Sequence, residues 1–502
     1  MLKDATYCLE TFGCQMNVLD SQLIEGQLRA LGMRPVATAH EADVVLYNTC
    51  SVREHAEQKV LSRLGVLRRI KRHQPEKIIG IIGCMAERAG KALLANMPHV
   101  DLLCGPGELN QLPALIEEVH ARHEQVAALA GSLSRRTEVL QRALEYDSLE
   151  ALDLARRPAP GQNVLQSYIR VQRGCDKFCT FCVVPFTRGA ERSRPPAHIV
   201  DEAQMLVDHG AREVTLLGQT VNSYLHQQGG NPVSFAKLLE RVHAVEALDR
   251  IRFVTSYPAD WDEDIFRVMR DFPRICPYLH LPAQSGSDRV LKAMRRPYSA
   301  AGYLNLIDKA RRYVPEISLA GDFIVGFCGE TEQDFQATLE LVRRIEYKNL
   351  FVFKYSPRPG TVADRRLTDD VPDSVKTRRC NELLAAQLEL GLAQKQRLIG
   401  RTVEVLVEGF SKAARRAQQA EQERGGEATK DFSRQLVGRS RGDWITVFDG
   451  DAGLIGALVN VQLERATPLA LQGRVVSVAS PPRMPAARRE SAHVSLPVLA
   501  AG

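Results

Sequence analysis

Residues 166–182, QSYIRVQRGCDKFCTFC, lead from an apolar strand pattern directly into three closely spaced cysteines. The run QSYIRVQ alternates in the manner of a β-strand, and Gly174 after it indicates a turn. Cys175, Cys179 and Cys182 therefore fall on a loop, in a C-x3-C-x2-C pattern. Three thiolates at this spacing can bind three irons of a 4Fe–4S cluster and leave the fourth iron without a protein ligand.

The strand before these cysteines is the first of a repeating strand–helix pattern. Between strands, apolar residues recur at helical spacing, as in PAHIVDEAQMLVDHG and TEQDFQATLELVRRI. Six such units predict an α/β fold with a barrel or partial barrel, in which chemistry takes place at the C-terminal ends of the strands. The further strands are expected at 213–218, 250–256, 278–283, 322–327 and 350–356, and a long helix follows at about 375–398.

The open iron suggests a cofactor. It can hold a small ligand that chelates through amino and carboxylate groups, and S-adenosylmethionine is the obvious candidate. One electron from the cluster would cleave that cofactor to a 5′-deoxyadenosyl radical. The alternative is structural zinc, but such zinc sites use four protein ligands, and the nearest histidine, His198, lies at a predicted helix start.

The first 125 residues show a second α/β pattern. Apolar strands at 5–12, 43–48, 77–83 and 100–105 alternate with helical stretches, which predicts an open parallel sheet over residues 1–125.

Three cysteines follow the first three of these strands. Because the C-terminal ends of parallel strands meet at one edge, Cys14, Cys50 and Cys84 could bind one cluster although 36 and 34 residues separate them. The alternative is that they are buried apolar thiols. Cys104 also follows a strand, and spacing alone does not exclude it as a ligand.

The other segments differ in composition. Residues 126–163 are charged and end in a Pro/Gly cluster, which predicts a linker or helical insertion on the surface. Residues 164–398 carry the barrel pattern, and residues 399–475 have the short strands and turns of a small all-β module. Within that module, 411–432 has no apolar face and is expected to be a flexible loop, and the tail at 476–502 is expected to be disordered.

Composition limits the class of protein. The chain has 502 residues and a net charge of +6, which allows an anionic partner without demanding one. No secretory signal begins the sequence and no run of about 18 apolar residues occurs, so we expect a soluble cytoplasmic protein without a membrane span. Eleven cysteines in that compartment indicate metal or redox chemistry rather than disulfides. A structural role is expected for Cys8, Cys276, Cys328 and Cys380.

The cysteine motifs resemble those of a known enzyme family. The C-x3-C-x2-C loop on a six-unit barrel resembles the radical S-adenosylmethionine superfamily. The blocks TFGCQMN, NTCSVREHAEQKV, GCMAER and GCDKFCTFCVVPFTRG closely resemble its methylthiotransferases, and the match extends to about residue 475. Cys104 matches no ligand position of that family. The resemblance implies two 4Fe–4S clusters: one that cleaves S-adenosylmethionine, on Cys175, Cys179 and Cys182, and an auxiliary one, on Cys14, Cys50 and Cys84.

Three blocks indicate which branch of the family the chain resembles. QMN at 15–17, SVRE at 51–54 and CVVPFTRG at 182–189 are similar to the branch that acts on dimethylallyladenosine next to the tRNA anticodon. The resemblance implies methylthiolation of carbon-2 of N(6)-dimethylallyladenosine at position 37 of tRNA. It also implies two molecules of S-adenosylmethionine per turnover, one that methylates sulfur at the auxiliary cluster and one that supplies the radical.

Two other functions stay open. A neighbouring branch methylthiolates threonylcarbamoyladenosine in tRNA. A non-catalytic, RNA-binding iron–sulfur protein that senses redox state belongs to a different class. The two sets of three cysteines argue against the sensor, because a sensor has no need for two incompletely ligated clusters.

Polar side chains and glycines at the predicted strand ends suit the ribose, amino acid and adenine parts of S-adenosylmethionine. Such residues are also ordinary at strand ends and turns. The blocks LPAQSGSDRVLKAMRR and GDFIVGFCGETEQDF resemble family blocks, with Cys328 where the family usually has proline. The expected cofactor-binding residues are Gly218, Gln219, Ser256, Gln284, Ser285, Asp322 and Tyr355.

The small β module resembles the TRAM domain, an RNA-binding barrel, in GRTVEVLVEG, LVGRS and LIGALVNVQLERATPLALQG. Arg439 and Arg441 are candidate phosphate contacts there. Phe186 is a candidate to stack on a flipped base, with core packing as the alternative. A basic helix end is either a further RNA contact or, as we expect, a solvated terminus: Arg68, Arg69, Lys71 and Arg72.

The resemblance also implies partners. We expect tRNA that carries dimethylallyladenosine as the substrate and a flavodoxin or ferredoxin as the electron donor. The enzyme is expected to be a monomer.

Overall fold

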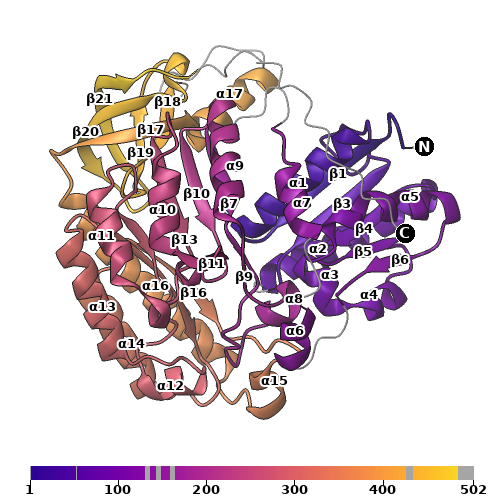
Figure 1. The fold of residues 1–502 in the computed structure, drawn as a ribbon, viewed down its shortest axis with the longest axis horizontal. Coiled ribbons are helices and arrows are strands. Elements are labelled where there is room, and N and C mark those ends of the chain that lie inside the picture. The colour runs from indigo at the N-terminus through magenta and orange to yellow at the C-terminus, as the bar shows by residue number, and fades with distance from the viewer. Residues whose placement is uncertain are drawn as a thin grey trace.

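In the computed structural model, the N-terminal strands form one parallel sheet in the order β2-β1-β3-β4-β5-β6 (Figure 1). The structure describes residues 2–51, 54–130, 136–142, 148–158, 164–424 and 434–483. The strands are β1 (Thr6–Phe12), β2 (Arg34–Pro35), β3 (Val44–Thr49), β4 (Ile78–Ile82), β5 (Leu102–Cys104) and β6 (Val126–Ala128). The helices are α1 (Gln15–Ala30), α2 (Glu54–His73), α3 (Cys84–Ala89), α4 (Lys91–Asn96), α5 (Leu112–Arg122), α6 (Arg136–Arg142) and α7 (Ser148–Leu154).

Alternating side chains give this sheet two buried faces. In β3, Val44 and Leu46 pack with α1 and α5, whereas Val45 and Tyr47 pack with α2, α3 and α4. A parallel sheet covered by helices on both sides needs apolar residues at every position, which explains the continuous apolar runs. Because the strands run in one direction, the segments after β1, β3 and β4 lie at the same edge of the sheet.

The segment after residue 125 contains helices, as one of the two expectations held, but its described part is partly buried rather than only on the surface. Strand β6 pairs with β5 and extends the N-terminal sheet. Glu150, Asp153 and Arg156 of the α7 region are each less than a tenth exposed. They are buried because they pair with charged residues at the start of the next domain. Residues 131–135, 143–147 and 159–163 lie outside the described residues.

The central strands form an open half-barrel from two parallel sheets, in the orders β13-β10-β7 and β14-β15-β16. A parallel bridge between Ile251 and Ile275 and a hydrogen bond from the Ser256 N–H to the His280 carbonyl (3.1 Å) join the two sheets. The predicted α/β half-barrel is thereby confirmed. Its strands are β7 (Gln166–Arg170), β10 (Glu213–Leu217), β13 (Arg250–Val254), β14 (Tyr278–His280), β15 (Ser318–Val325) and β16 (Asn349–Lys354).

Helices cover the outside of the half-barrel, and their apolar faces form one core with the strands. Among the helices of the described residues, none combines the length and the hydropathy that a membrane span requires. The helices that share this core are α9 (Pro196–Asp208), α10 (Phe235–His243), α11 (Glu263–Asp271), α13 (Ala300–Tyr313), α14 (Glu332–Ile345) and α16 (Asp373–Gln396). The shorter helices α8 (Val184–Arg188), α12 (Asp288–Ala293) and α15 (Val362–Arg366) contribute no residue to it. Two short hairpins are β8 (Gln172–Arg173) with β9 (Arg192–Ser193), and β11 (Leu225–Gln228) with β12 (Asn231–Ser234).

The C-terminal strands close into a small barrel in the order β17-β18-β19-β21-β20. This confirms the predicted small all-β module. The strands are β17 (Thr402–Phe410), β18 (Gln435–Ser440), β19 (Ile445–Asp449), β20 (Leu458–Ala466) and β21 (Leu471–Ser480).

Two expectations for this module were wrong. The run expected to be a flexible loop forms helix α17 (Lys412–Arg424), because Ala, Gln, Glu and Arg favour helices and the Ser411 Oγ caps its start. The last strand extends to Ser480 rather than ending near 475, because Val478 still pairs with Val459 of β20. Residues 425–433 and 484–502 lie outside the described residues.

Buried arginines dock this barrel on the half-barrel. Arg250 donates to the Arg439 carbonyl (2.7 Å), and Arg252 donates to the Ser440 carbonyl (2.7 Å). Arg212 donates to the carbonyl of Pro481, the residue just after β21 (2.9 Å). Arg212 and Arg250 lie at the N-terminal ends of β10 and β13. The small barrel therefore covers the end of the half-barrel opposite the cysteine loop, and Figure 1 shows it at the upper left, away from the N-terminal sheet.

Candidate active site

A cavity of about 330 Å³ lies between the N-terminal domain and the half-barrel. Leu217 and Val254, at the ends of β10 and β13, line it and also pack against the N-terminal domain. Five of the six predicted cluster ligands line the same cavity: Cys14, Cys50, Cys175, Cys179 and Cys182. The sixth, Cys84, is buried beside Cys14. Two cysteine sets from different domains therefore lie around one space.

The loop that carries Cys175, Cys179 and Cys182 closes on its own backbone. The Cys175 N–H donates to the Gly189 carbonyl (3.1 Å), and β8 pairs with β9 at the base of the loop. Gly174 has a φ of +63°, and a Cβ there would lie 1.9 Å from the Ala190 carbonyl oxygen, so only glycine fits. This loop is held by contacts within a short stretch of chain.

The three N-terminal cysteines are brought together by parallel strands. Cys14 follows β1 and is the N-cap of α1, Cys50 follows β3, and Cys84 begins α3 after β4. The Cys50 N–H donates to the Phe12 carbonyl (2.9 Å), which aligns the ends of the first two strands. The predicted convergence of these three positions at one sheet edge agrees with this geometry.

Two buried asparagines hold the three strand ends. The Asn17 Nδ2 donates to the Asn48 Oδ1 (2.9 Å), and the Asn17 Oδ1 accepts from the Cys14 backbone N–H (3.3 Å). A Cβ at Gly13 or at Gly83 would lie 2.5 Å from an oxygen of this pair. Both glycines are therefore needed for the close packing of the strand ends.

Each cysteine set has one arginine beside it. Arg188 at the end of α8 contacts the Cys84 thiol, and the charge of Arg296 acts on Cys179 and Cys182. A guanidinium group favours the thiolate, which is the form that binds iron. A hydrogen bond from Cys50 lowers the pKa of Cys14 to about 5, whereas burial raises the pKa of Cys182 to about 12.

The residues around the cavity fit iron–sulfur clusters with a bound cofactor. The buried Nε of Arg296 and the Oγ of Ser256, both from residues that line the cavity, have no hydrogen-bond partner among the residues that the structure describes. Within the described part of the chain, no three His, Cys, Asp or Glu side chains are placed to hold a single metal ion. Zinc would hold its thiolates about 2.3 Å from one ion, whereas a cluster spreads them over separate irons. Three thiolates in each set match the ligands of a 4Fe–4S cluster with one open iron, so the donor set fits such clusters.

Six of the seven expected cofactor-binding residues line the cavity: Gly218, Gln219, Ser256, Gln284, Asp322 and Tyr355. Ser285 does not. Its Oγ lies 3.3 Å from the Thr338 Oγ1 and accepts a hydrogen bond from the Ser287 N–H (3.2 Å). The chain turns toward α14 after Gln284, so the structure does not support a cofactor contact for Ser285.

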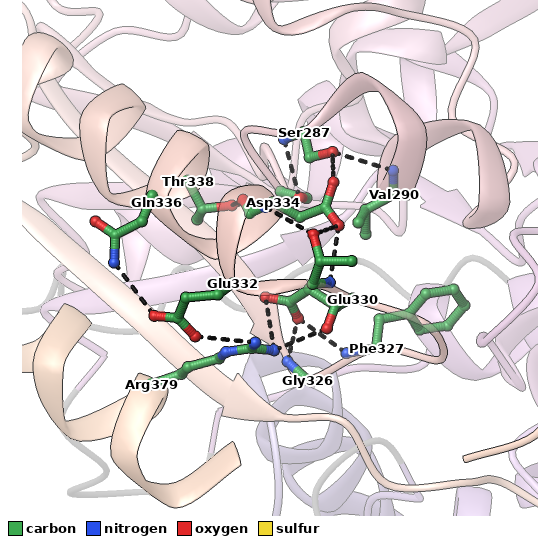
Figure 2. Close-up of polar contacts among 12 residues, drawn as sticks. Ser287, Val290, Gly326, Phe327, Glu330, Glu332, Asp334, Gln336, Thr338 and Arg379 are labelled. Carbon is green, nitrogen blue, oxygen red and sulfur yellow. Dashed lines mark hydrogen bonds and ion pairs between the residues drawn. The ribbon is translucent and has the colours of Figure 1, made fainter. Parts of the chain in front are cut away.

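Figure 2 shows the polar contacts around the loop that follows β15. The Glu330 carboxylate accepts hydrogen bonds from the Gly326 and Phe327 N–H groups and lies 3.6 Å from Arg379. Burial raises the pKa of Glu330 to about 7, although Arg379 opposes that rise. On the other side of the loop, Asp334 accepts from the Ser287 Oγ (2.6 Å). These contacts fix the cavity rim next to Ile324.

The remaining cysteines do not line the cavity. The Cys104 Sγ donates to the Glu108 carbonyl (3.3 Å) inside the N-terminal core, and burial raises its pKa. Cys8 and Cys276 are buried, Cys380 packs on the main core, and Cys328 lies against Tyr355. These positions agree with the structural roles expected for them.

The candidate phosphate contacts are engaged within the protein. Arg439 pairs with Glu408 (3.2 Å) and Asp443 (3.0 Å), and Arg441 donates to the Ile275 carbonyl (3.1 Å). The structure therefore does not support the predicted RNA contacts of these arginines.

The other candidates for RNA contacts differ in exposure. Phe186 packs edge-on against Phe178 at 5.9 Å, which favours the core alternative. In the basic end of α2, Lys71 pairs with Asp101, whereas Arg68, Arg69 and Arg72 are exposed. An RNA contact of these three stays a prediction. Val52 and Arg53 of the SVRE block lie outside the described residues.

Sequence reasoning missed the charged residues that join the domains at the site. Asp20 of α1 accepts hydrogen bonds from Arg170 (2.8 Å) and Arg188 (2.9 Å), and all three are nearly inaccessible to solvent. A possible signal was Arg170, a charged residue inside a predicted buried strand. Nothing in the local pattern identified Asp20, Arg188 or Arg296 as neighbours of the cysteines.

Comparisons with known proteins agree with this geometry. Residues 6–105 match the family described as Uncharacterized protein family UPF0004, and residues 169–342 match the Radical SAM superfamily. The superfamily match implies a 4Fe–4S cluster and S-adenosylmethionine. The solved structure of the radical S-adenosylmethionine methyltransferase TsrM from Kitasatospora setae has a similar fold, with a TM-score of 0.52 and 13% identity over 81% of this chain and 78% of that one.

Two curated relatives match over nearly their whole length. The tRNA-2-methylthio-N(6)-dimethylallyladenosine synthase of Rhodopirellula baltica is 45% identical over 94% of this chain and 96% of its own. The enzyme of the same name from Moorella thermoacetica is 42% identical over 94% of this chain and 98% of its own. The chain therefore belongs to the family of tRNA-2-methylthio-N(6)-dimethylallyladenosine synthases, within the radical S-adenosylmethionine methylthiotransferases.

Proposed function

We propose that this protein methylthiolates carbon-2 of N(6)-dimethylallyladenosine at position 37 of tRNA. The observation that carries the proposal is the meeting of two three-cysteine sets around one cavity. A sulfur-inserting enzyme needs one open iron to cleave its cofactor and a second to hold sulfur, both within reach of one base. The curated relatives carry the name of this activity.

The proposed ligand sets are Cys175, Cys179 and Cys182 for one 4Fe–4S cluster, and Cys14, Cys50 and Cys84 for an auxiliary one. When bound, the clusters and two molecules of S-adenosylmethionine supply the electron, the radical, the methyl group and the sulfur. In the net reaction the C2–H bond of the base is replaced by C2–S–CH3. One cofactor molecule gives up its methyl group, and the other yields methionine and a 5′-deoxyadenosine that carries away the hydrogen.

The chain's own residues bind and orient the reactants. Gly218 and Gln219 let the backbone and an amide approach the cofactor at the end of β10, and Ser256, Gln284, Asp322 and Tyr355 offer polar atoms around it. The unpartnered Arg296 Nε is placed to hold an anionic group of the cofactor near Cys179 and Cys182. The N-terminal domain covers the inner side of the half-barrel and excludes water from the radical.

The further partners of the reaction are part of the proposal. A reduced flavodoxin or ferredoxin supplies the electron, tRNA with dimethylallyladenosine is the substrate, and the enzyme acts as a cytoplasmic monomer.

The test is nucleoside mass spectrometry of tRNA from a bacterial strain that lacks its own methylthiolation enzyme, with and without this gene. The expected result is 2-methylthio-N(6)-dimethylallyladenosine only when the gene is present. A methylthio group only on threonylcarbamoyladenosine would keep the chemistry and change the substrate. Absence of any methylthio nucleoside, with both clusters loaded and the dimethylallyl precursor present, would overturn the proposal.

A further inference from the structure

One wall of the cavity is built from alternate residues of three neighbouring strands. Side chains in a strand point to opposite faces in turn, so every second residue reaches the same space. The residues of this wall that line the cavity are Tyr278 and His280 of β14, Asp322 and Ile324 of β15, and Phe351 and Phe353 of β16. The wall is therefore largely aromatic.

Phe351 lies toward the end of the cavity away from the cysteines, level with Asp322, its register partner on β15. Tyr355, at the cysteine end of the cavity, is four residues further along the same extended chain. At 3.3 Å per residue, about 13 Å separates the two positions along the strand. A cofactor that contacts the cysteine loop, Tyr355 and the near side of Asp322 still leaves the open face of the Phe351 ring for the substrate.

Phe351 is the one exposed large apolar side chain among the lining residues, with 40% of its surface accessible. Its ring meets His280 edge-on at 5.9 Å, which leaves much of the ring open to the cavity. Strand β16 is the outer strand of its sheet, so the ring lies beside the open side of the half-barrel. An open aromatic surface inside a cavity indicates an apolar ligand group.

The polar groups beside Phe351 are satisfied within the protein. The His280 Nδ1 accepts from the Thr255 N–H (3.3 Å), which leaves the Nε2–H to donate to Asp322 (2.9 Å). Lys354, the next cation along β16, pairs with Asp373 (2.8 Å). The wall therefore favours a hydrocarbon substituent over a carboxylate such as that of threonylcarbamoyladenosine.

We propose that Phe351, with Phe353 and Tyr278, binds the dimethylallyl group of the substrate base. The inference rests on the proposed function and identifies the residue that selects the modified base. The branched five-carbon alkenyl group covers the exposed ring of Phe351, and burial of both surfaces favours the modified RNA. Removal of a hydrocarbon contact of this size in a binding pocket costs roughly tenfold in discrimination.

The test measures binding without turnover. Full-length protein with both clusters reconstituted, kept anaerobic and without a reductant, is titrated against two fluorescent anticodon stem-loop RNAs. One carries dimethylallyladenosine and the other carries adenosine at the same position. The wild type should prefer the modified RNA, and Phe351→Ala should reduce that preference about tenfold with little change for the unmodified RNA.

Two further variants sharpen the result. Phe351→Leu keeps an apolar side chain and should retain most of the preference. Leu388→Ala removes an equally open apolar side chain (52% exposed) from α16, outside the cavity, and should leave both affinities unchanged.

Three outcomes would overturn the inference or its basis. An unchanged preference in Phe351→Ala would mean that the alkenyl group binds elsewhere. An equal loss of affinity for both RNAs would mean that Phe351 contacts the RNA generally. A wild type without any preference, together with no methylthio nucleoside in the cellular test, would overturn the proposed function itself.

Discussion

The two cysteine sets reach the same cavity by different routes. Cys175, Cys179 and Cys182 lie within eight residues on a loop that closes on its own backbone. Cys14, Cys50 and Cys84 come from three strand ends and depend on the register of a whole parallel sheet. A short loop can form its ligand geometry locally, whereas the dispersed set exists only when the N-terminal domain is folded.

The comparison also shows how the domains are held together. Asp20 lies on α1, the helix that Cys14 caps. Its carboxylate accepts a hydrogen bond from Arg188, at the end of α8, which begins just after Cys182. The same carboxylate accepts from Arg170 of β7. The relative position of the two sets therefore depends on a small group of buried charges rather than on either set alone.

The largest expected effect is on activity, when one cysteine of each set is replaced and the two variants are compared. Cys179→Ala is expected to abolish both 5′-deoxyadenosine formation and methylthiolation. Cys50→Ala should keep cofactor cleavage and abolish sulfur insertion, with iron falling from about eight to about four per chain. The measurement is 5′-deoxyadenosine formed from S-adenosylmethionine and dithionite under anaerobic conditions. Loss of cleavage in a folded Cys50→Ala protein that retains the barrel cluster would contradict separate roles for the two sets.

Asp20→Ala tests the link between the sets. It leaves the buried Arg188 without its carboxylate and should lower the free energy of unfolding by about 3–5 kcal/mol. Urea unfolding followed by circular dichroism measures the change. The control is Glu118→Ala, which breaks an exposed pair with Arg122 (2.9 Å) and should cost less than about 1 kcal/mol. Equal effects of the two substitutions would mean that Asp20 does not join the domains.

Glu330→Gln extends the comparison to a loop that, like the cysteine loop, is closed by contacts within a short stretch of chain, here between the Glu330 carboxylate and two backbone N–H groups. Burial raises the pKa of Glu330 from 4.5 to about 7, so the folded protein binds this proton more tightly than the unfolded chain. The stability that this group contributes is present below about pH 4.5 and is lost as the pH rises to about 7.

The Tm of wild type and Glu330→Gln should therefore diverge between about pH 5 and about pH 8. Over that range the wild type should lose about 2–3 kcal/mol relative to the variant. Parallel pH profiles of the two proteins would show that Glu330 is ionised in the folded state throughout.

Cys104→Ala should have the smallest effect. Its thiol is bonded inside the core, so iron content should not change and stability should fall by only about 1 kcal/mol. Cys84→Ala, at the neighbouring strand end, is the matched variant and should lose the auxiliary iron. Iron analysis and the spectra of the reconstituted proteins distinguish the two. Loss of iron in Cys104→Ala would place a fourth thiol at the auxiliary site.

Much of the fold followed from periodicity and local spacing. The six half-barrel strands, the long helix α16 and the C-terminal barrel lie where their patterns predicted them, because hydrophobic periodicity reports which side of an element is buried. The strand-end positions of Cys14, Cys50 and Cys84 also followed from the sequence, because all parallel strands end at one edge. The assignment of α17 as a loop failed because helix propensity and a Ser411 cap outweighed the missing apolar face.

The sequence by itself determined most of the elements, their order and the two cysteine sets, because these depend on residues close together in the chain or on a repeated pattern. Only the tertiary structure decided which side chains meet at the cavity. It turned Ser285 away, brought Arg188 and Arg296 beside the thiols, buried the charges of α7 and left Phe351 open. These outcomes depend on the directions and distances between residues far apart in the chain, which no local pattern encodes.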